Sequence, residues 1–248
     1  MSLLYESIQA VIAGGMLSTG PQADTLAVTC VNKLRTFLEE SDQNCTSYIV
    51  LRSYQVKYVG LLALAKITST HADLVSDHHD LILSCIDDAD ISIRLRALDL
   101  LVGMVTRDSL TEIVKQLMLQ LLEPPPDSTS PPLPDHYRIE LVRRILAMST
   151  RDNYGNIGNN FEWYVAVLVD LARIAKVDVG RELGEEILNV TVRVKSVRAF
   201  SVKVLRDLLR DLEVISAGVE KLQGQSEVLG AAAWIVGEYS RYSPLKLC

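Results

Sequence analysis

One stretch constrains the fold more than any other: the segment from Asp87 to Val105, DDADISIRLRALDLLVGMV. Steps of four and three link one helical stripe of apolar residues, and further apolar residues occupy most of the remaining surface. A helix that is apolar almost all round must be covered on more than one side, as in a stacked array of helical repeats. The stripe comprises Ile91, Leu95, Leu98, Val102 and Val105, and the second set comprises Ile93, Ala97, Leu100, Leu101 and Met104.

The polar residues of this segment have separate roles. Asp90 precedes the apolar run and is the predicted N-cap of its helix. Arg94, Arg96 and Asp99 interrupt the stripe. The favoured interpretation is that they lie at the edges of the apolar face with their heads in water. The alternative is that they pair with acidic groups of adjacent repeats and set the stacking.

The rest of the chain also shows helical periodicity, and no segment alternates with period two for long enough to form a strand. A hydrophobic content of 48% with only 6% aromatic residues suits a helical protein. Asp77, Asp135 and Ser226 are predicted to begin helices, and Ser109 with Glu112 is a predicted capping box. The helices are expected near residues 3–12, 23–40, 48–67, 77–86, 91–105, 109–122, 135–148, 161–175, 182–194, 197–215 and 228–239.

An internal repeat supports this interpretation. VGLLALAKI (Val59–Ile67) and LRALDLLVG (Leu95–Gly103) match in their small and leucine positions. Irregular recurrence of such segments is typical of HEAT or armadillo repeats, whereas tetratricopeptide repeats keep a stricter period. The sequence therefore predicts an all-α fold, an α-solenoid of HEAT/armadillo-like helix pairs. We expect residues 1–248 to form a single solenoid.

The segment 123–135, EPPPDSTSPPLPD, is the one break in composition. Its prolines lack backbone donors and block helix formation, so the segment is predicted to be a loop. We favour an insertion between two stacked helices, because helical character resumes directly after it. A proline-motif ligand is the alternative, since such segments are already extended.

Charge and composition exclude several classes of function. The formal net charge of −6 argues against nucleic-acid binding. The sequence contains no run of 18 apolar residues, so no membrane span is predicted. The N-terminus lacks the basic region of a signal peptide, and an abrupt helix after Met1 suggests a start inside a longer protein. The four cysteines have no CxxC spacing, which favours a reducing compartment, and Cys30 is predicted to lie in the core.

Catalytic and metal-binding motifs are lacking. The neighbouring His78 and His79 point to different faces of a helix, so a surface position is favoured over a shared metal. Asp87, Asp88 and Asp90 are explained by capping and by the helix dipole. No nucleophile elbow, phosphate-binding loop or zinc-protease motif occurs. We therefore expect no enzyme, no cofactor and no metal.

One run of positive charge is a candidate binding surface. It contains Arg193, Lys195, Arg198, Lys203 and Arg206, with no acidic residue between them. A basic edge of this kind is a possible contact for anionic lipid head groups or an acidic partner. The favoured alternative is a solvated helix face balanced by acidic neighbours, which are Glu182, Glu185, Glu186 and Asp207.

Several stretches resemble the large adaptin subunits, and within them the delta-adaptin family of the third heterotetrameric adaptor-protein complex. They are SLLYE (Ser2–Glu6), VKYVGLLAL (Val56–Leu64), DLILSCIDDADISIRLRALDLLVGMV (Asp80–Val105), LTEIVKQLM (Leu110–Met118), NFEWYVAVLVDLARI (Asn160–Ile174) and EVLGAAAWIVGEYS (Glu227–Ser240). The resemblance covers the chain except for the proline-rich segment, which departs from the family pattern.

This resemblance implies a non-enzymatic scaffold: a middle-to-late piece of an adaptin trunk without the early trunk, hinge and ear. Its implied partners are sigma, beta and mu subunits, with cargo tails bound through the assembled complex. The implied location is cytoplasmic and peripheral on Golgi or endosomal membranes, where cargo is sorted to lysosomes or vacuoles. The family's dileucine-signal residues and small-GTPase contact have no matching motif in this chain.

Three other hypotheses compete with this one. The first is another HEAT-repeat transport scaffold, such as a coatomer large subunit or a transport receptor. The second is a lipid-binding module, which requires the basic residues to share one exposed face. The third is an enzyme, which requires a deep polar pocket with convergent titratable groups.

Overall fold

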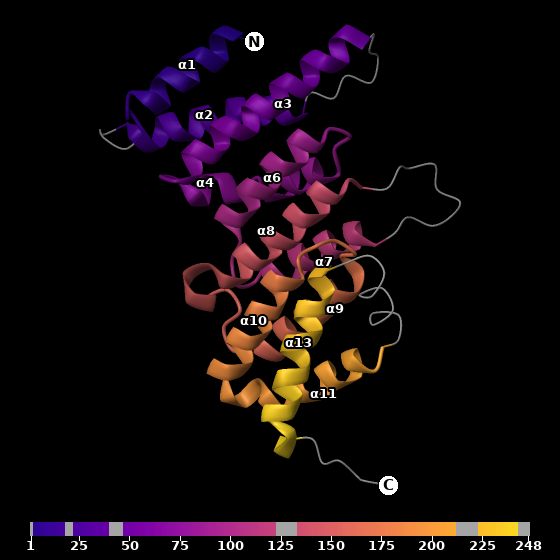
Figure 1. Ribbon diagram of the computed structural model, residues 1–248. Helices are drawn as coiled ribbons and strands as arrows, with labels where there is room; N and C mark the ends of the chain where they lie inside the picture. Colours follow the sequence, from indigo (N-terminus) through magenta and orange to yellow (C-terminus); the bar gives the residue numbers. More distant parts are fainter. Residues whose placement is uncertain (1, 18–21, 40–46, 123–132, 212–222, 243–248) are drawn as a thin grey trace. The chain divides into compact units, whose positions relative to one another are not determined.

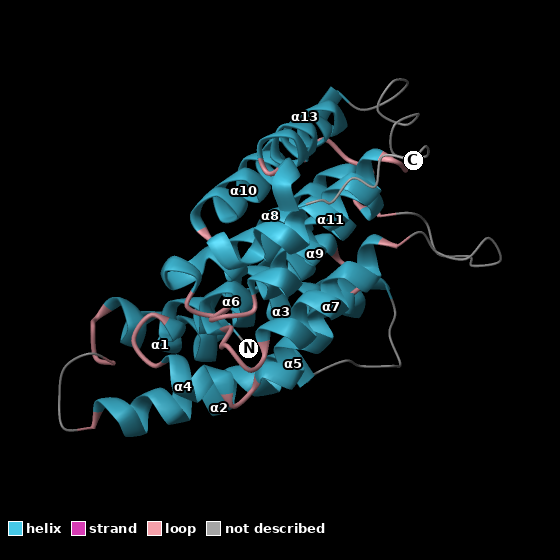
Figure 2. Cartoon of the chain, turned by 90° about the horizontal axis from the view of Figure 1, so that it is seen from below, coloured by secondary structure: helices cyan, strands magenta, loops and turns pink. Residues whose placement is uncertain are grey.

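The computed structural model describes residues 2–17, 22–39, 47–122, 133–211 and 223–242, and all of its regular structure there is helical (Figures 1 and 2). No strand occurs among the described residues, as the periodicity predicts. The chain divides into two compact units, Met1–Thr106 and Arg107–Cys248. Each unit is described by itself, and a single continuous solenoid over residues 1–248 stays a prediction. The insertion expected at residues 123–135 falls almost wholly outside the described residues, from which 123–132 are missing.

Unit 1 is built around helices α3 and α6, which pack against each other, while α2 packs on α3. Its core is formed by aliphatic side chains from these helices, among them Leu34, Leu61, Leu64 and Leu98, each at most 1% exposed. The elements are α1 (Ser2–Ala13), α2 (Ala23–Glu39), α3 (Ser47–Thr68), α4 (Ala72–Ser76), α5 (His79–Ser84), the 3₁₀ turn η1 (Cys85–Asp87) and α6 (Ile91–Met104).

Helix α6 confirms the predicted cap and refines the predicted face. The Asp90 carboxylate accepts a hydrogen bond of 2.7 Å from the Ser92 amide. Leu98 of the predicted stripe is fully buried, but Ile91, Leu95 and Val102 are only half-buried. The more completely covered face is the second apolar set, comprising Ile93, Ala97, Leu100, Leu101 and Met104.

The charged residues of α6 are half-buried, as expected for residues at the edges of its apolar face, and they are also hydrogen-bonded there. Arg96 pairs with Asp99 of its own helix at 3.1 Å and donates to the Tyr58 hydroxyl of α3 at 3.2 Å. Its guanidinium lies over the Tyr58 ring, 5.4 Å from the centroid. Arg94 donates to the Asp88 carbonyl. The partners of Arg96 thus include an aromatic side chain of α3, and those of Arg94 include a backbone carbonyl just before α6.

Unit 2 places α10 against α13 as its most extensive helix contact, and α11 packs on both α13 and α9. Tyr137, Tyr164, Leu168 and Leu205 are fully buried in its core. The elements are α7 (Leu110–Leu121), α8 (Asp135–Tyr154), α9 (Phe161–Ile174), α10 (Gly180–Arg193), the 3₁₀ turn η2 (Lys195–Val197), α11 (Arg198–Leu209), α13 (Gln223–Glu238) and the 3₁₀ turn η3 (Ser240–Tyr242).

Two predicted helix starts, at Asp77 and Ser226, are wrong, and two predicted caps, at Ser109 and Asp135, are not formed although their helices begin where expected. Asp77 ends α4, so the helix expected at 77–86 is two short helices and a 3₁₀ turn. The Ser109 side chain makes no cap hydrogen bond, because its backbone is already helical (φ −88°, ψ −20°). Pro134 is the N-cap of α8 and Asp135 is its first residue. Ser226 lies inside α13, which begins at Gln223. The starts of α7 and α8 therefore agree with the sequence, whereas Asp77 follows the end of α4 and α13 begins before Ser226.

The last residues of α8 and the turn that follows them have unusual backbone geometry. Asp152, Asn153 and Tyr154 all have positive φ, between 52° and 66°, and Gly158 follows at φ +60°. Asp and Asn tolerate this left-handed region better than other side-chain-bearing residues, and Gly does so without penalty. Tyr154 is held there by its hydroxyl, whose partners are described below.

Candidate interaction surfaces

The five basic residues of the predicted anionic contact lie at the end of α10, in η2 and along α11. Arg193, Lys195 and Lys203 have exposed side chains. Arg206 is half-buried, with its guanidinium 3.7 Å from the Asp207 carboxylate. The structure therefore does not present all five residues to solvent in the same way.

Arg198 has a structural role. Its guanidinium donates to the carbonyls of Thr191 (3.2 Å) and Val192 (2.6 Å) near the C-terminus of α10. It also lies over the Tyr239 ring, 4.6 Å from the centroid. A cation at this end of a helix complements the helix dipole, and the ring contact adds a cation–π attraction. Through these contacts, Arg198 connects the end of α10 to the end of α13. The exposed residues of the basic run are therefore Arg193, Lys195 and Lys203.

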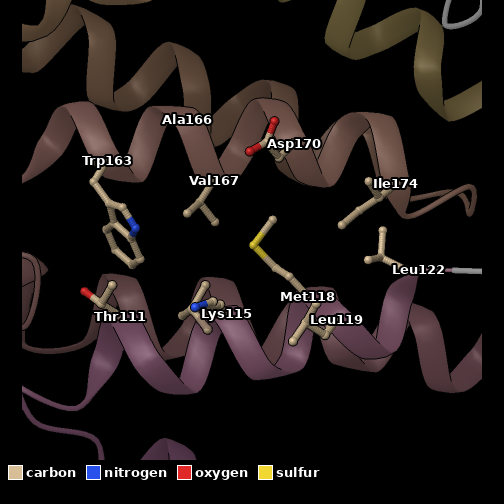
Figure 3. A pocket seen from close by; sticks show the side chains of 11 residues that line it. Thr111, Lys115, Met118, Leu119, Leu122, Trp163, Ala166, Val167, Asp170 and Ile174 are labelled. Atoms are coloured by element: carbon tan, nitrogen blue, oxygen red, sulfur yellow. The ribbon is translucent and has the colours of Figure 1, made fainter.

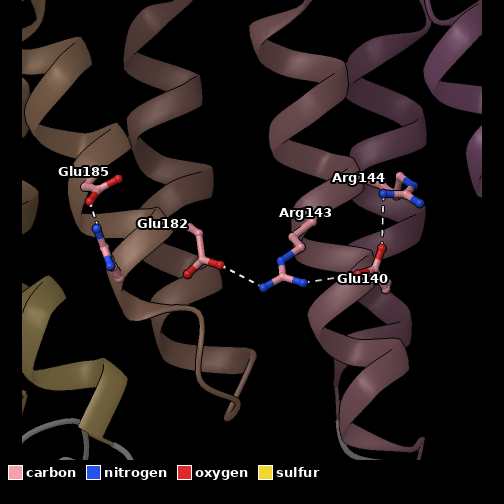
Figure 4. Close-up of polar contacts among 6 residues, drawn as sticks. Glu140, Arg143, Arg144, Glu182 and Glu185 are labelled. Atoms are coloured by element: carbon pink, nitrogen blue, oxygen red, sulfur yellow. Dashed lines mark hydrogen bonds and ion pairs between the residues drawn. The ribbon is translucent and has the colours of Figure 1, made fainter.

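The acidic residues expected to balance this run have other partners. Arg143 of α8 bonds both Glu140 (3.3 Å) and Glu182 of α10 (3.0 Å), and Glu185 pairs with Arg181 at 3.0 Å (Figure 4). The ion pairs in Figure 4 therefore connect α8 to α10, and they engage two of the four acidic residues, Glu182 and Glu185. Asp207 lies beside a member of the basic run, with its carboxylate 3.7 Å from the Arg206 guanidinium.

Another of the four acids, Glu186, joins a partly buried polar network. Its carboxylate accepts hydrogen bonds from the hydroxyls of Tyr154 (2.8 Å) and Tyr164 (3.1 Å), and Asn189 donates to the Tyr154 oxygen at 2.6 Å. Burial and the nearby Glu186 charge raise the pKa of Tyr154 to about 12 and raise that of Tyr164 as well. Both hydroxyls therefore stay protonated at neutral pH, and the network fixes α8, α9 and α10 together.

Metal-ligating residues are not gathered in the described part of the chain, where no group of three His, Cys, Asp or Glu side chains has a metal-binding arrangement. His79 is exposed and lies 3.1 Å from Asp80, and His78 precedes α5. Cys30 and Cys85 are buried thiols whose pKa is raised by burial. Among the described helices, none has the length and apolar character needed to cross a membrane.

Unit 2 carries an apolar groove between α7 and α9 that the sequence reasoning missed (Figure 3). Its volume is about 420 Å³. Leu119 and Leu122, on one side of the groove, are 58% and 50% exposed. The sequence feature that could have predicted this groove is a second set of apolar residues in and just after α7, including Leu119 and Leu122, in addition to the residues of its buried face. The lining residues are Thr111, Val114, Lys115, Met118, Leu119, Leu122, Trp163, Ala166, Val167, Asp170 and Ile174.

The two walls of this groove run in the same direction. Trp163 lies opposite Thr111 at one end, and Ile174 lies near Leu122 at the other (Figure 3). Met118 extends from α7 toward α9, beside Val167. The groove thus follows α7 over about three helical turns, or roughly 17 Å.

Comparison with known proteins places these features in a family context. Residues 1–246 match the family model described as "Adaptin N terminal region". The chain is 42% identical over 244 residues to the AP-3 complex subunit delta-1 of Bos taurus and 39% identical over 243 residues to the AP-3 complex subunit delta of Schizosaccharomyces pombe. Each match covers 98% of this chain, but only 18% and 28% of the respective relative.

A structural comparison agrees with the sequence comparisons. The fold is similar to a chain of a structure titled "Homology model of the full-length AP-3 complex in an intermediate open conformation", with a TM-score of 0.72 and 26% identity. The similarity covers 98% of this chain and 42% of the other.

Proposed function

Because this chain belongs to the adaptin family, whose N-terminal region it matches, we propose that it acts as part of the trunk of an AP-3 delta subunit. The predicted resemblance to delta-adaptins and the predicted all-α, helical-repeat fold class are both confirmed. The proposed function is a non-enzymatic scaffold in a vesicle adaptor complex that sorts membrane cargo from Golgi or endosomes to the lysosome or vacuole. The family match over almost the whole chain carries this proposal.

The proposed partners are the sigma, beta and mu subunits of the same complex, with cargo tails bound through the assembly. Helical units that each pack on their neighbours present long surfaces for proteins rather than a closed catalytic cavity. Both relatives are subunits of AP-3 complexes, which supports this assignment. We propose a cytoplasmic location, peripheral on Golgi or endosomal membranes.

Co-purification tests the assembly proposal. The chain is co-expressed with the sigma, beta and mu subunits of an AP-3 complex, and in parallel with the equivalent AP-1 subunits as the control. We expect stable capture of at least one AP-3 subunit and none of the AP-1 subunits. Equal capture of both sets, or no capture by a chain that circular dichroism shows to be folded, contradicts the proposal that this segment carries AP-3-specific assembly contacts.

We also propose that the exposed basic residues Arg193, Lys195 and Lys203 contact an anionic membrane surface. Their support is the exposure of all three and the engagement of Glu182, Glu185 and Glu186 elsewhere. Attraction between a basic segment and anionic lipid is worth about 1 kcal/mol per Lys or Arg near the surface and weakens with salt.

Liposome co-sedimentation tests this contact. Triple reversal of Arg193, Lys195 and Lys203 to Glu is expected to lower binding to phosphatidylserine-containing vesicles and to leave binding to neutral vesicles unchanged. The matched control reverses three basic residues of unit 1: Lys33, Arg35 and Lys66. Unchanged binding in the first variant, or an equal loss in the control, disproves a specific contact.

A further inference from the structure

The groove between α7 and α9 is a surface to which the proposed assembly function assigns no role. Its walls are two helices of one unit, running in the same direction for about three turns. Its lining is apolar along its length, with Trp163 near one end, Met118 in the middle and Leu122 at the other end (Figure 3). Half or more of the surface of Leu119 and Leu122 is open to solvent.

The shape and composition of this groove suit one class of occupant. A third helix laid between two parallel helices fills such a space with side chains from one of its faces. About 420 Å³ is at the lower end of the range for well-formed binding pockets and suits a few aliphatic side chains. Aromatic and methionine side chains are common at binding surfaces. An aromatic ring such as that of Trp163 offers a large rigid contact area, and the flexible thioether of a methionine such as Met118 adapts to the shape of its partner.

The charges on the two walls are opposite. Lys115 projects from α7 and is exposed, while Asp170 projects from α9 on the other side (Figure 3). Arg173 lies 3.6 Å from Asp170, but it also lies 3.5 Å from Asp211 and is therefore shared between two carboxylates. A complementary helix carries an acidic residue on the flank facing α7 and a basic residue on the flank facing α9. The charge pair consequently also sets the direction of the bound helix.

We propose that the α7–α9 groove binds an amphipathic helix of a partner protein, with an apolar stripe, an acidic flank and a basic flank. The apolar stripe lies against Met118, Leu119, Trp163 and Val167, and Lys115 and Asp170 read the two flanks. The inference does not depend on the adaptor function, since it rests on the geometry and charge of unit 2 alone.

Three designed helical peptides with the same leucine stripe test the proposal by fluorescence anisotropy with the full 248-residue chain. One peptide has an acidic and a basic flank, the second has two acidic flanks, and the third has two basic flanks. The first is expected to bind about two- to fivefold more tightly than the others, because each of the others places one like charge against a wall. Lys115→Glu is expected to make the doubly basic peptide the tightest binder, and Asp170→Lys the doubly acidic one.

Apolar contact is tested by a matched pair of leucine substitutions. Leu119→Glu in the groove is expected to weaken binding of all three peptides by at least about tenfold. Leu3→Glu changes a leucine that is 80% exposed in unit 1 and is expected to leave binding unchanged. Both positions are exposed, so each variant is expected to keep the helical content of the parent chain.

Other results overturn the proposal. Absence of binding by all three peptides, or equal weakening by Leu119→Glu and Leu3→Glu, rules out a helix-binding groove. The same ranking of the peptides in the parent chain, Lys115→Glu and Asp170→Lys rules out recognition of the flanks. Sedimentation equilibrium tests a different occupant of the groove. A dimer that Leu119→Glu converts to a monomer would show that a second copy of the chain, and not a partner helix, covers the groove.

Discussion

At the scale of single residues, Arg138 shows how a buried charge is used within unit 2. It is only 7% exposed, and it lies in the first turn of α8. Its guanidinium donates to the carbonyls of Leu121 at the end of α7 and of Ile174 and Ala175 at the end of α9, at 3.0–3.2 Å. One side chain thus satisfies carbonyls at two helix C-termini, where the helix dipoles also favour a positive charge.

Arg138→Met is expected to leave these carbonyls without their donor while keeping most of the apolar volume of the side chain. Each buried carbonyl left unsatisfied costs about 1–3 kcal/mol, so the expected loss in the free energy of unfolding is at least about 3 kcal/mol. Urea titration of the variant measures it. Arg173→Met, which removes a half-buried arginine of α9, is the control and is expected to cost less. Equal losses in the two variants contradict a special role for Arg138.

Leu98 is the corresponding apolar test in unit 1. Its side chain is fully buried, and α6 is packed against α3. Leu98→Ala is expected to cost about 2–5 kcal/mol, through lost transfer free energy and the cavity left behind. A loss below about 1 kcal/mol in a denaturant titration disagrees with this placement, because a site open to water or able to collapse would lose much less.

The ionisation of Tyr154 is expected to make the free energy of unfolding depend on pH in the alkaline range. Burial and Glu186 raise its pKa in the folded chain to about 12, above its ordinary value near 10. Because the protonated phenol is favoured by folding, its contribution is complete below about pH 10 and is lost as the pH rises through about 12. We expect unfolding midpoints to fall over this window more steeply in the parent chain than in Tyr154→Phe. Parallel pH profiles for the two proteins contradict this linkage.

At the scale of elements, the close approach of α10 and α13 depends on small residues. A Cβ on Gly184 would lie 3.2 Å from the Glu227 carbonyl oxygen and 3.5 Å from the Ala231 methyl carbon. The 3.2 Å contact is shorter than most real Cβ contacts and is made to backbone, so a side chain larger than a methyl group is expected to push the helices apart. The family resemblance includes the segment with Ala231, but it gives no reason why Gly184 must be small.

Gly184→Leu is expected to displace α13 and lower the protection of its amides in hydrogen exchange, because the largest helix contact of unit 2 cannot close around the added atoms. Hydrogen-exchange mass spectrometry resolves this effect by segment. Gly230→Leu is the control, since nothing lies within 4 Å of a Cβ at that position. Replacing Gly by Leu raises helix propensity at both positions, so propensity predicts no loss of protection. A loss in α13 that is equal in both variants contradicts a specific role for the close contact at Gly184.

At the scale of the whole molecule, the proline-rich segment is expected to be dispensable for folding. Its predicted role is an insertion between two stacked helices, and long surface loops add little to the entropy cost of closure. Replacing residues Pro124–Pro134 with a few glycine and serine residues is expected to leave helical content and thermal stability nearly unchanged. Circular dichroism melting measures both. Loss of folding would show that the segment is packed against the rest of the chain.

The helical class, the positions of most helices to within a few residues, the Asp90 cap and the adaptin resemblance could all be predicted from the sequence alone. These properties depend on periodicity and on residues close together in the chain, so a linear pattern contains them. It also placed Cys30 and Leu98 in the core correctly, although Ile91, Leu95 and Val102 of the same stripe as Leu98 are only half-buried. The predicted surface position of the histidine pair is confirmed for His79, which is exposed.

Only the tertiary structure decided which members of a pattern remain available for binding. Arg198 and Lys195 look equivalent in the sequence, but α13 brings Tyr239 against Arg198 and leaves Lys195 exposed. The α7–α9 groove, with Lys115 and Asp170 on opposite walls, likewise exists only because residues about 55 positions apart face each other. The physical reason is that burial and pairing depend on which helices approach, and short-range periodicity sets the faces of a helix but not its neighbours.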